Sequence, residues 1–231
     1  MYLRKALMIV SMLVAAAAGS ASAQQPYAPM QPPQPTNDDG KIEVIEFFWY
    51  GCPHCYKVEP EVNAWAKSLP PDVVFKRIPA YPSESWGDAA RIFYTLDAMG
   101  LAEKYHDKVF DAIHKDNVNV INRKIRDKWL KENDIDPKKY EEVSKSFTVE
   151  SNLSRDKQMT INYKVDGVPR FVIGGKYYTS GEVAGGEDKI MPAVDQAIAK
   201  VREEGGGTKS TSAAKPGKAV KSDKPVKTSK D

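Results

Sequence analysis

Hydrophobic and polar positions follow two different patterns at the start of this chain of 231 residues. Residues 41–50 are rich in β-branched and aromatic side chains, and from residue 44 only Glu46 interrupts the apolar run. Such a run is typical of a strand buried on both faces of an α/β sheet. Apolar residues recur at helical spacing over 52–69, and a second strand-like run covers 73–78. The order strand, helix, strand predicts a βαβ unit with parallel strands.

The pattern becomes purely helical after residue 83. Apolar positions at helical spacing predict five helices, over 86–99, 101–114, 122–132, 137–145 and 147–163. Two short strands joined by Gly174 and Gly175 follow within 167–179, and a Gly-Gly pair between such runs is typical of a hairpin. A last amphipathic helix is expected over 187–201. The element order is therefore β–α–β, a helical block, then β–β–α.

The two ends of the chain differ from this folded body. Residues 1–23 combine a basic start, an apolar stretch and a small-residue cleavage site, which predicts a cleavable secretory signal. The apolar stretch is short for a membrane span, although an uncleaved anchor is the alternative. The mature protein is then expected in the bacterial periplasm or outside the cell, where disulfides persist.

Composition and charge add two further segments. Residues 24–40 are rich in Pro and Gln and are expected to form an extended, disordered leader. Residues 204–231 carry many lysines without apolar periodicity and are expected to form a disordered tail. The formal net charge of +3 hides this asymmetry, because residues 24–206 alone sum to −4. The folded body is therefore mildly acidic, and weak attraction of the tail to anionic lipid is a minor alternative.

Both cysteines lie in one motif, Cys52-Pro53-His54-Cys55, where the first strand gives way to the first helix. The i, i+3 spacing places two sulfurs within bridging reach, and Pro53 suits the first helical position. The positive helix N-terminus and a nearby His54 both favour a Cys52 thiolate, which makes the disulfide more oxidising. Cys55 lies one turn further in, so we expect it to be more buried, less acidic and able to resolve a mixed disulfide formed at Cys52.

Two other uses of the cysteine pair are possible from the sequence. A zinc site needs about four ligands, whereas the chain has two cysteines in all and three histidines. A purely structural disulfide would close a very short loop and stabilise little. A redox-active Cys52–Cys55 pair, without a bound metal, is therefore the preferred interpretation.

Three residues outside the motif are candidates for the same site. Glu46 is a carboxylate within an apolar strand; if buried, it would have a raised pKa and could exchange a proton with Cys55. The alternative is a glutamate that reaches solvent from the strand end. Pro169 heads a late strand, and a cis bond there would present Val168 as a hydrogen-bonding edge for a substrate chain.

These motifs together resemble the DsbA family of periplasmic thiol:disulfide oxidoreductases. The resemblance rests on Glu-Phe-Phe-x-x-x-Cys-Pro-His-Cys-Tyr and Gly-Val-Pro-x-Phe-x-x-x-Gly-Lys-Tyr and covers roughly 41–203. It implies an α/β, thioredoxin-like fold in two parts, 41–84 and 148–203, with a helical domain inserted at 85–147. It also implies roles for individual residues: exposed nucleophile Cys52, resolving thiol Cys55, thiolate stabiliser His54, buried acid Glu46 and cis-proline Pro169.

The resemblance further implies a monomer that donates its disulfide to newly exported proteins and is reoxidised by a DsbB-type, quinone-linked membrane partner. No organic cofactor, metal or nucleic acid is expected. Glu59 matches a second carboxylate of the family, with Lys76 or Arg77 as its basic partner; a surface ion pair of these basic residues is the alternative. Arg170, a charge directly after Pro169, departs from the family pattern. A disulfide isomerase or reductase and a non-catalytic chaperone are the rival functions.

Overall fold

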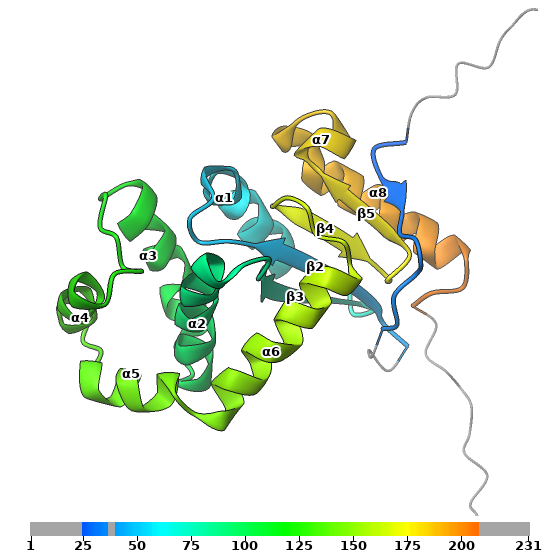
Figure 1. Cartoon of the computed structure of the whole chain (residues 1–231). Coiled ribbons are helices and arrows are strands. Elements are labelled where there is room, and N and C mark those ends of the chain that lie inside the picture. The colour runs from blue at the N-terminus through cyan, green and yellow to red at the C-terminus, as the bar shows by residue number, and fades with distance from the viewer. Residues whose placement is uncertain (1–24, 37–39, 208–231) are drawn as a thin grey trace, which may run out of the picture.

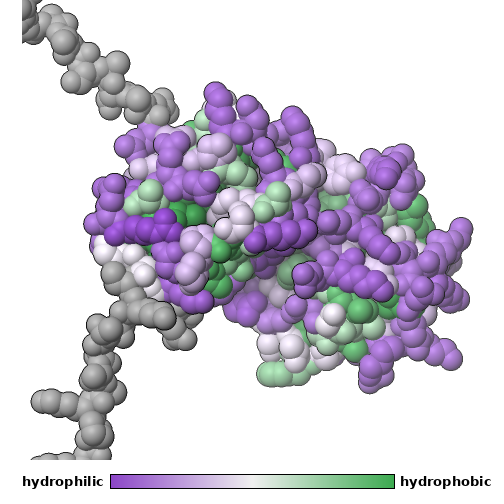
Figure 2. Space-filling model, turned by 180° about the vertical axis from the view of Figure 1, so that it is seen from behind, coloured by the Kyte–Doolittle hydropathy of each residue, from purple (hydrophilic) through white to green (hydrophobic). Residues whose placement is uncertain are grey.

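The computed structural model describes residues 25–36 and 40–207. The expected signal segment and most of the lysine-rich tail lie outside these residues. Within them, no helix combines the length and apolar character needed to cross a membrane. Seen from behind, the surface is mainly hydrophilic, with hydrophobic residues in small separate areas (Figure 2).

A five-stranded mixed sheet forms the centre of the molecule, in the order β1-β5-β4-β2-β3. Its strands are β1 (Ala28–Pro29), β2 (Ile42–Phe48), β3 (Val73–Pro79), β4 (Arg170–Ile173) and β5 (Tyr177–Ser180). The β2–β3 pair is parallel and the other pairs are antiparallel. Every residue of β2 is buried, as its apolar sequence predicts. The βαβ unit and the late hairpin are both confirmed, and Gly174 and Gly175 adopt the positive φ angles that the tight turn requires.

Alternate residues of β2 supply two separate cores. Val44 packs with Val62 of α1 and Val194 of α8, on one face of the sheet. Ile45 packs with Tyr163, at the end of α6, on the other face. The period of two in a strand thus places helices on both faces, as Figure 1 shows.

The helices α1 to α6 agree closely with the sequence pattern, whereas α7 was not predicted and the helix expected over 187–201 begins with a 3-10 turn. They are α1 (Pro53–Lys67), α2 (Glu84–Ala98), α3 (Ala102–His114), α4 (Arg123–Glu132), α5 (Pro137–Ser144), α6 (Phe147–Asn162), α7 (Gly181–Ala184), the 3-10 turn η1 (Glu187–Lys189) and α8 (Ile190–Glu203). Helices α2 to α5 form a block at one side of the sheet, and α6 runs from this block back along the sheet (Figure 1). A third core joins this block to the end of β2 and contains both cysteines together with Ile92 and Phe110. The redox motif therefore lies where sheet and helical block meet.

The prediction of a disordered leader is wrong for residues 25–36. β1 pairs with β5, and the Met30 N–H donates to the Lys176 carbonyl at 2.7 Å. Met30 is only 4 % exposed and packs beside Ile45 and Phe47. The β5 edge offers unpaired backbone groups, and Pro29 is tolerated because β1 is itself an edge strand. The segment crosses the sheet edge as the blue strand of Figure 1.

Candidate active site

Cys52 caps the N-terminus of α1. Its backbone is extended, Pro53 takes the first helical position, and the Cys55 N–H donates to Cys52 Sγ at 3.4 Å. Proline suits this position because its missing N–H would have no helical partner. The sulfur therefore occupies the place where a side-chain acceptor normally satisfies the first free N–H groups of a helix.

The pKa of Cys52 is lowered to about 6, and the helix start contributes more than His54 does. The largest cause is the hydrogen bond from the Cys55 thiol. Burial acts in the opposite direction, and the N–H groups of Cys55 and His54, then the charge of His54, lower the pKa further. The expectation of an acidic Cys52 is thus supported. The expectation of an exposed Cys52 is wrong for this structure, because the residue is 7 % exposed beneath its neighbours.

Cys55 has the opposite character. It is fully buried, and burial, followed by the neighbouring Cys52, raises the pKa of its thiol well above the usual value. Both cysteines are free thiols here. The predicted contrast in burial and acidity between Cys52 and Cys55 is confirmed, and it makes Cys52 the sulfur that more readily carries a negative charge.

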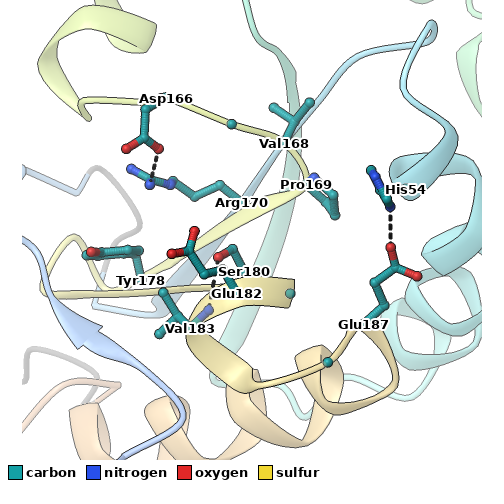
Figure 3. Close-up of a pocket in the computed structure, with 13 residues that line it drawn as sticks. His54, Asp166, Val168, Pro169, Arg170, Tyr178, Ser180, Glu182, Val183 and Glu187 are labelled. Carbon is teal, nitrogen blue, oxygen red and sulfur yellow. Dashed lines mark hydrogen bonds and ion pairs between the residues drawn. The ribbon is translucent and has the colours of Figure 1, made fainter.

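The loop before β4 lies against Cys52, although 116 residues separate the two in sequence. The Val168–Pro169 peptide bond is cis, and Cys52 Sγ donates to the Val168 carbonyl at 3.4 Å. Val168 and Pro169 are therefore brought to the redox motif, as the sequence suggested. Together with His54 and Glu187 they line a groove of about 800 Å³ beside the motif (Figure 3).

Glu46 is fully buried in the middle of the sheet, so the alternative of a glutamate reaching solvent is wrong. Its pKa is raised to about 8, first by burial and then by Glu59, while Arg77 opposes the shift. Arg77 Nε lies 3.2 Å from Glu46 Oε2. The charge of the same carboxylate contributes to the raised pKa of Cys55, after burial and Cys52, so Glu46 and the resolving thiol interact electrostatically.

Arg77 rather than Lys76 is the basic partner of Glu59. One Arg77 amino group donates to Glu59 Oε1 at 2.7 Å, whereas Lys76 pairs with Glu43. His106, on α3, places Nε2 3.3 Å from the same Glu59 oxygen and Nδ1 2.9 Å from the Tyr50 hydroxyl. His106 is not among the site residues that the sequence analysis identified. Its helical pattern shows an inward face but cannot show that a glutamate from another helix lies opposite.

His54 lies at the rim of the groove, with a side chain that is 66 % exposed. Its Nδ1 bonds Oε1 of Glu187 (Figure 3), and Lys57 donates to the other oxygen of this carboxylate, Oε2, at 2.6 Å. The sequence analysis did not identify Glu187 as a site residue, because no motif or spacing in the sequence marks it. Across the groove, Arg170 is held by Asp166 and by the Lys164 carbonyl at 2.7 Å. Its charge is therefore largely engaged within the protein.

The described residues offer no site for a metal ion. They contain no cluster of three or more His, Cys, Asp or Glu side chains placed to hold a metal ion. The chemistry that the geometry offers is that of the two thiols and the carboxylate behind them.

Comparison with known proteins agrees with this site. Residues 71–197 match the family model of the DSBA-like thioredoxin domain. The chain is 41 % identical to the thiol:disulfide interchange protein DsbA of Azotobacter vinelandii over 168 residues, which cover 73 % of this chain and 78 % of the relative. It is 36 % identical to the protein of that name from Pseudomonas aeruginosa strain PAO1 over 189 residues, or 82 % and 90 % of the two chains.

Solved structures show the same relationship. The crystal structure of Pseudomonas aeruginosa DsbA superposes with a TM-score of 0.73 at 35 % identity, covering 78 % of this chain and 94 % of that one. The oxidoreductase NmDsbA1 from Neisseria meningitidis gives 0.66 at 28 % identity, with coverages of 78 % and 93 %. The paired thiols, the thioredoxin-like fold and these similarities agree: the chain belongs to the DsbA family and is a thiol:disulfide oxidoreductase.

Proposed function

We propose that this protein is a periplasmic disulfide donor for newly exported proteins. The observation that carries the proposal is the opposed character of its two thiols. The pKa of Cys52 is lowered to about 6 at a helix N-terminus, and that of the buried Cys55 is raised. A stabilised thiolate favours the reduced form of the protein, so the disulfide is a strong oxidant.

The reaction begins with the oxidised Cys52–Cys55 pair. A substrate thiolate attacks Cys52 Sγ, a new S–S bond forms, and the electron pair of the old bond leaves on Cys55. A second substrate thiolate then attacks the substrate sulfur of this mixed disulfide, and Cys52 leaves as a thiolate. The substrate dithiol becomes a disulfide, and two electrons remain here as two reduced cysteines.

Glu46 is the proton donor for the first step in this proposal. Cys55 leaves as a thiolate in a buried site, where a negative charge is costly, and its high pKa means that it takes up a proton. Glu46 has a pKa of about 8 and so still carries a proton at neutral pH. The Arg77–Glu59 pair adjoining Glu46 then offers a route by which the proton is replaced.

Val168 and Pro169 supply the docking edge for the substrate. The Val168 carbonyl already accepts from Cys52 Sγ, so a chain paired along this loop would bring its own thiolate to Cys52 Sγ, the atom that it attacks. His54 faces the same groove. This arrangement binds mainly through backbone groups, which suits a donor that meets many different unfolded chains.

The expected signal at 1–23 supports a periplasmic location, and the family supports reoxidation by a DsbB-type membrane partner. The disulfide itself is the electron acceptor, so the proposal includes no organic cofactor or metal. The protein acts as a monomer in this proposal. The two-part division at 41–84 and 148–203, with the insert at 85–147, is retained as the proposed domain organisation.

Trapping the mixed disulfide tests the assignment of the nucleophile. Cys55→Ser should accumulate a covalent Cys52 adduct with an unfolded substrate whose cysteine is held as a mixed disulfide with thionitrobenzoate. The Cys52 thiolate attacks the substrate sulfur and thionitrobenzoate leaves, and the adduct persists because no resolving thiol remains. Cys52→Ser is the matched control and should form at least ~10-fold less adduct. Equal adduct formation by both variants, detected by mass spectrometry, would contradict the assignment.

Equilibration with glutathione tests the direction of electron flow. A strongly oxidising potential supports the donor, and a thioredoxin-like potential would favour the reductase instead. The chaperone alternative predicts that Cys52→Ser retains full activity in refolding a disulfide-containing substrate. Loss of that activity, with the fold intact, would eliminate the chaperone.

A further inference from the structure

Glu187 links the end of the hairpin to the redox motif. It begins η1, directly after Gly185 and Gly186, and lies 133 residues from its partner His54 in sequence. Gly186 has a φ of 153°, and its N–H donates to the Gly181 carbonyl at 2.8 Å, which turns the chain back toward α1. An L side chain is disfavoured at this φ, so the turn that presents Glu187 depends on glycine.

Glu187 clamps α1 through both of its carboxylate oxygens. One carboxylate oxygen bonds His54 Nδ1 and the other bonds Lys57 Nζ at 2.6 Å. The Glu187 side chain is only 20 % exposed, whereas that of His54 is 66 % exposed. The bonds from Lys57 and then from His54 hold the pKa of Glu187 below its usual range, so this carboxylate is ionised at neutral pH.

Other charged groups near this clamp are already engaged or lie across the groove. Asp188 follows Glu187 on η1 and acts on Lys57. On the opposite wall Arg170 is neutralised by Asp166, and the remaining acidic side chain that lines the groove is Glu182. Among the groups that line the groove, Glu187 is thus the one that bonds the imidazole of the redox motif.

A carboxylate at this position opposes the effect of His54 on the cysteine. The positive charge of His54 lowers the pKa of Cys52 and so favours the thiolate. Glu187 brings a full negative charge to the same ring, so the pair as a whole attracts the thiolate less than a free imidazolium would. The oxidised protein has no thiolate, so this opposition acts on the reduced form alone.

We propose that Glu187 is a positioning residue that acts through His54 to moderate the oxidising power of the Cys52–Cys55 disulfide. The inference depends on the proposed role of Cys52 as the sulfur whose thiolate is stabilised. It assigns to the segment after the hairpin a function in redox tuning. A replacement that keeps the shape of Glu187 and removes its charge should therefore make the protein a stronger oxidant.

Glu187→Gln tests this inference. Ultraviolet absorbance of the thiolate against pH should show the Cys52 midpoint moving to lower pH, and the equilibrium constant for oxidising glutathione should rise ~2- to 5-fold. Glu203→Gln is the matched control, because Glu203 is an exposed α8 carboxylate 3.8 Å from Lys200. It should leave both quantities unchanged. An unchanged or higher Cys52 midpoint in Glu187→Gln would overturn the proposal.

A double variant tests whether Glu187 acts through His54. In a His54→Asn background, Glu187→Gln should change the glutathione equilibrium less than it does beside the native histidine. An undiminished change would refute the positioning role. A wild-type protein with an ordinary Cys52 midpoint would instead contradict the proposed function itself, so the two failures are distinguishable.

Discussion

Glu46 is the residue at which chemistry and stability are most directly opposed. It is fully buried with a pKa of about 8, while a glutamate in an unfolded chain titrates near 4.5. Because the folded pKa is raised, the stability that Glu46 contributes is complete below pH 4.5 and is lost as the pH rises through about 8. At neutral pH the folded state must therefore hold a proton that the unfolded state releases.

Glu46→Gln should consequently raise the free energy of unfolding at pH 7 by about 1–3 kcal/mol, and by much less at pH 4. Urea denaturation at both pH values measures this difference. Glu43→Gln is the control on the same strand; Glu43 pairs with Lys76, so its neutralisation should not stabilise the protein. A Glu46→Gln variant less stable than wild type at pH 7 would show that the charged form is the favoured one.

The motif residues could be found from the sequence because their spacing itself carries the chemistry. Cys52 and Cys55 are one helical turn apart, and Glu46 interrupts an apolar strand. His106 and Glu187 could not be found in this way. Their partners, Glu59 and His54, come from a different element in each case, and only the folded chain brings them together.

At the scale of elements, helices were predicted well because their ends are marked by local chemistry. Asn122, Asp136 and Ser146 each cap the helix that follows with a side-chain oxygen. β1 carries no such signal, since a two-residue strand has no measurable periodicity and its Pro/Gln-rich surroundings are typical of disorder. Its structure comes from the exposed edge of β5, which is formed more than 140 residues later.

Met30 gives a direct test of the β1 segment. Met30→Ala removes a side chain that is 4 % exposed beside Ile45 and Phe47, so it should cost about 2–3 kcal/mol of unfolding free energy. Gln25→Ala changes an exposed residue of the same segment and should be nearly neutral. Equal stability of the two variants in urea titrations would instead support the prediction that this segment is disordered.

At the scale of the whole molecule, the redox motif lies in the core that joins the sheet to the helical block. The sequence indicated both parts and their order. It could not indicate this junction, because Phe110 and Ile92 reach the cysteines only through the packing of α3 and α2 against the end of β2. Electron transfer at Cys52 is therefore linked to the stability of the whole fold.

That linkage predicts how the stability of the two redox states varies with pH. In the reduced protein the pKa of Cys52 falls from an ordinary 9.0 to about 6, so its contribution is present at high pH and is lost as the pH falls through 6. The oxidised protein lacks the Cys52 thiolate and its contribution. Burial raises the pKa of Glu46 to about 8 and that of Asp156, on α6, to about 6, and both carboxyl groups titrate in both redox states, so they cancel in the difference. The unfolding free energy of the reduced form minus that of the oxidised form should therefore rise by about 1–2 kcal/mol between pH 5 and pH 8, after allowance for solvent screening.

Parallel urea titrations of the reduced and oxidised forms measure this difference, with the Cys52→Ala/Cys55→Ala double variant as the baseline. A difference that stays constant over this range would show that the Cys52 thiolate is not stabilised by folding.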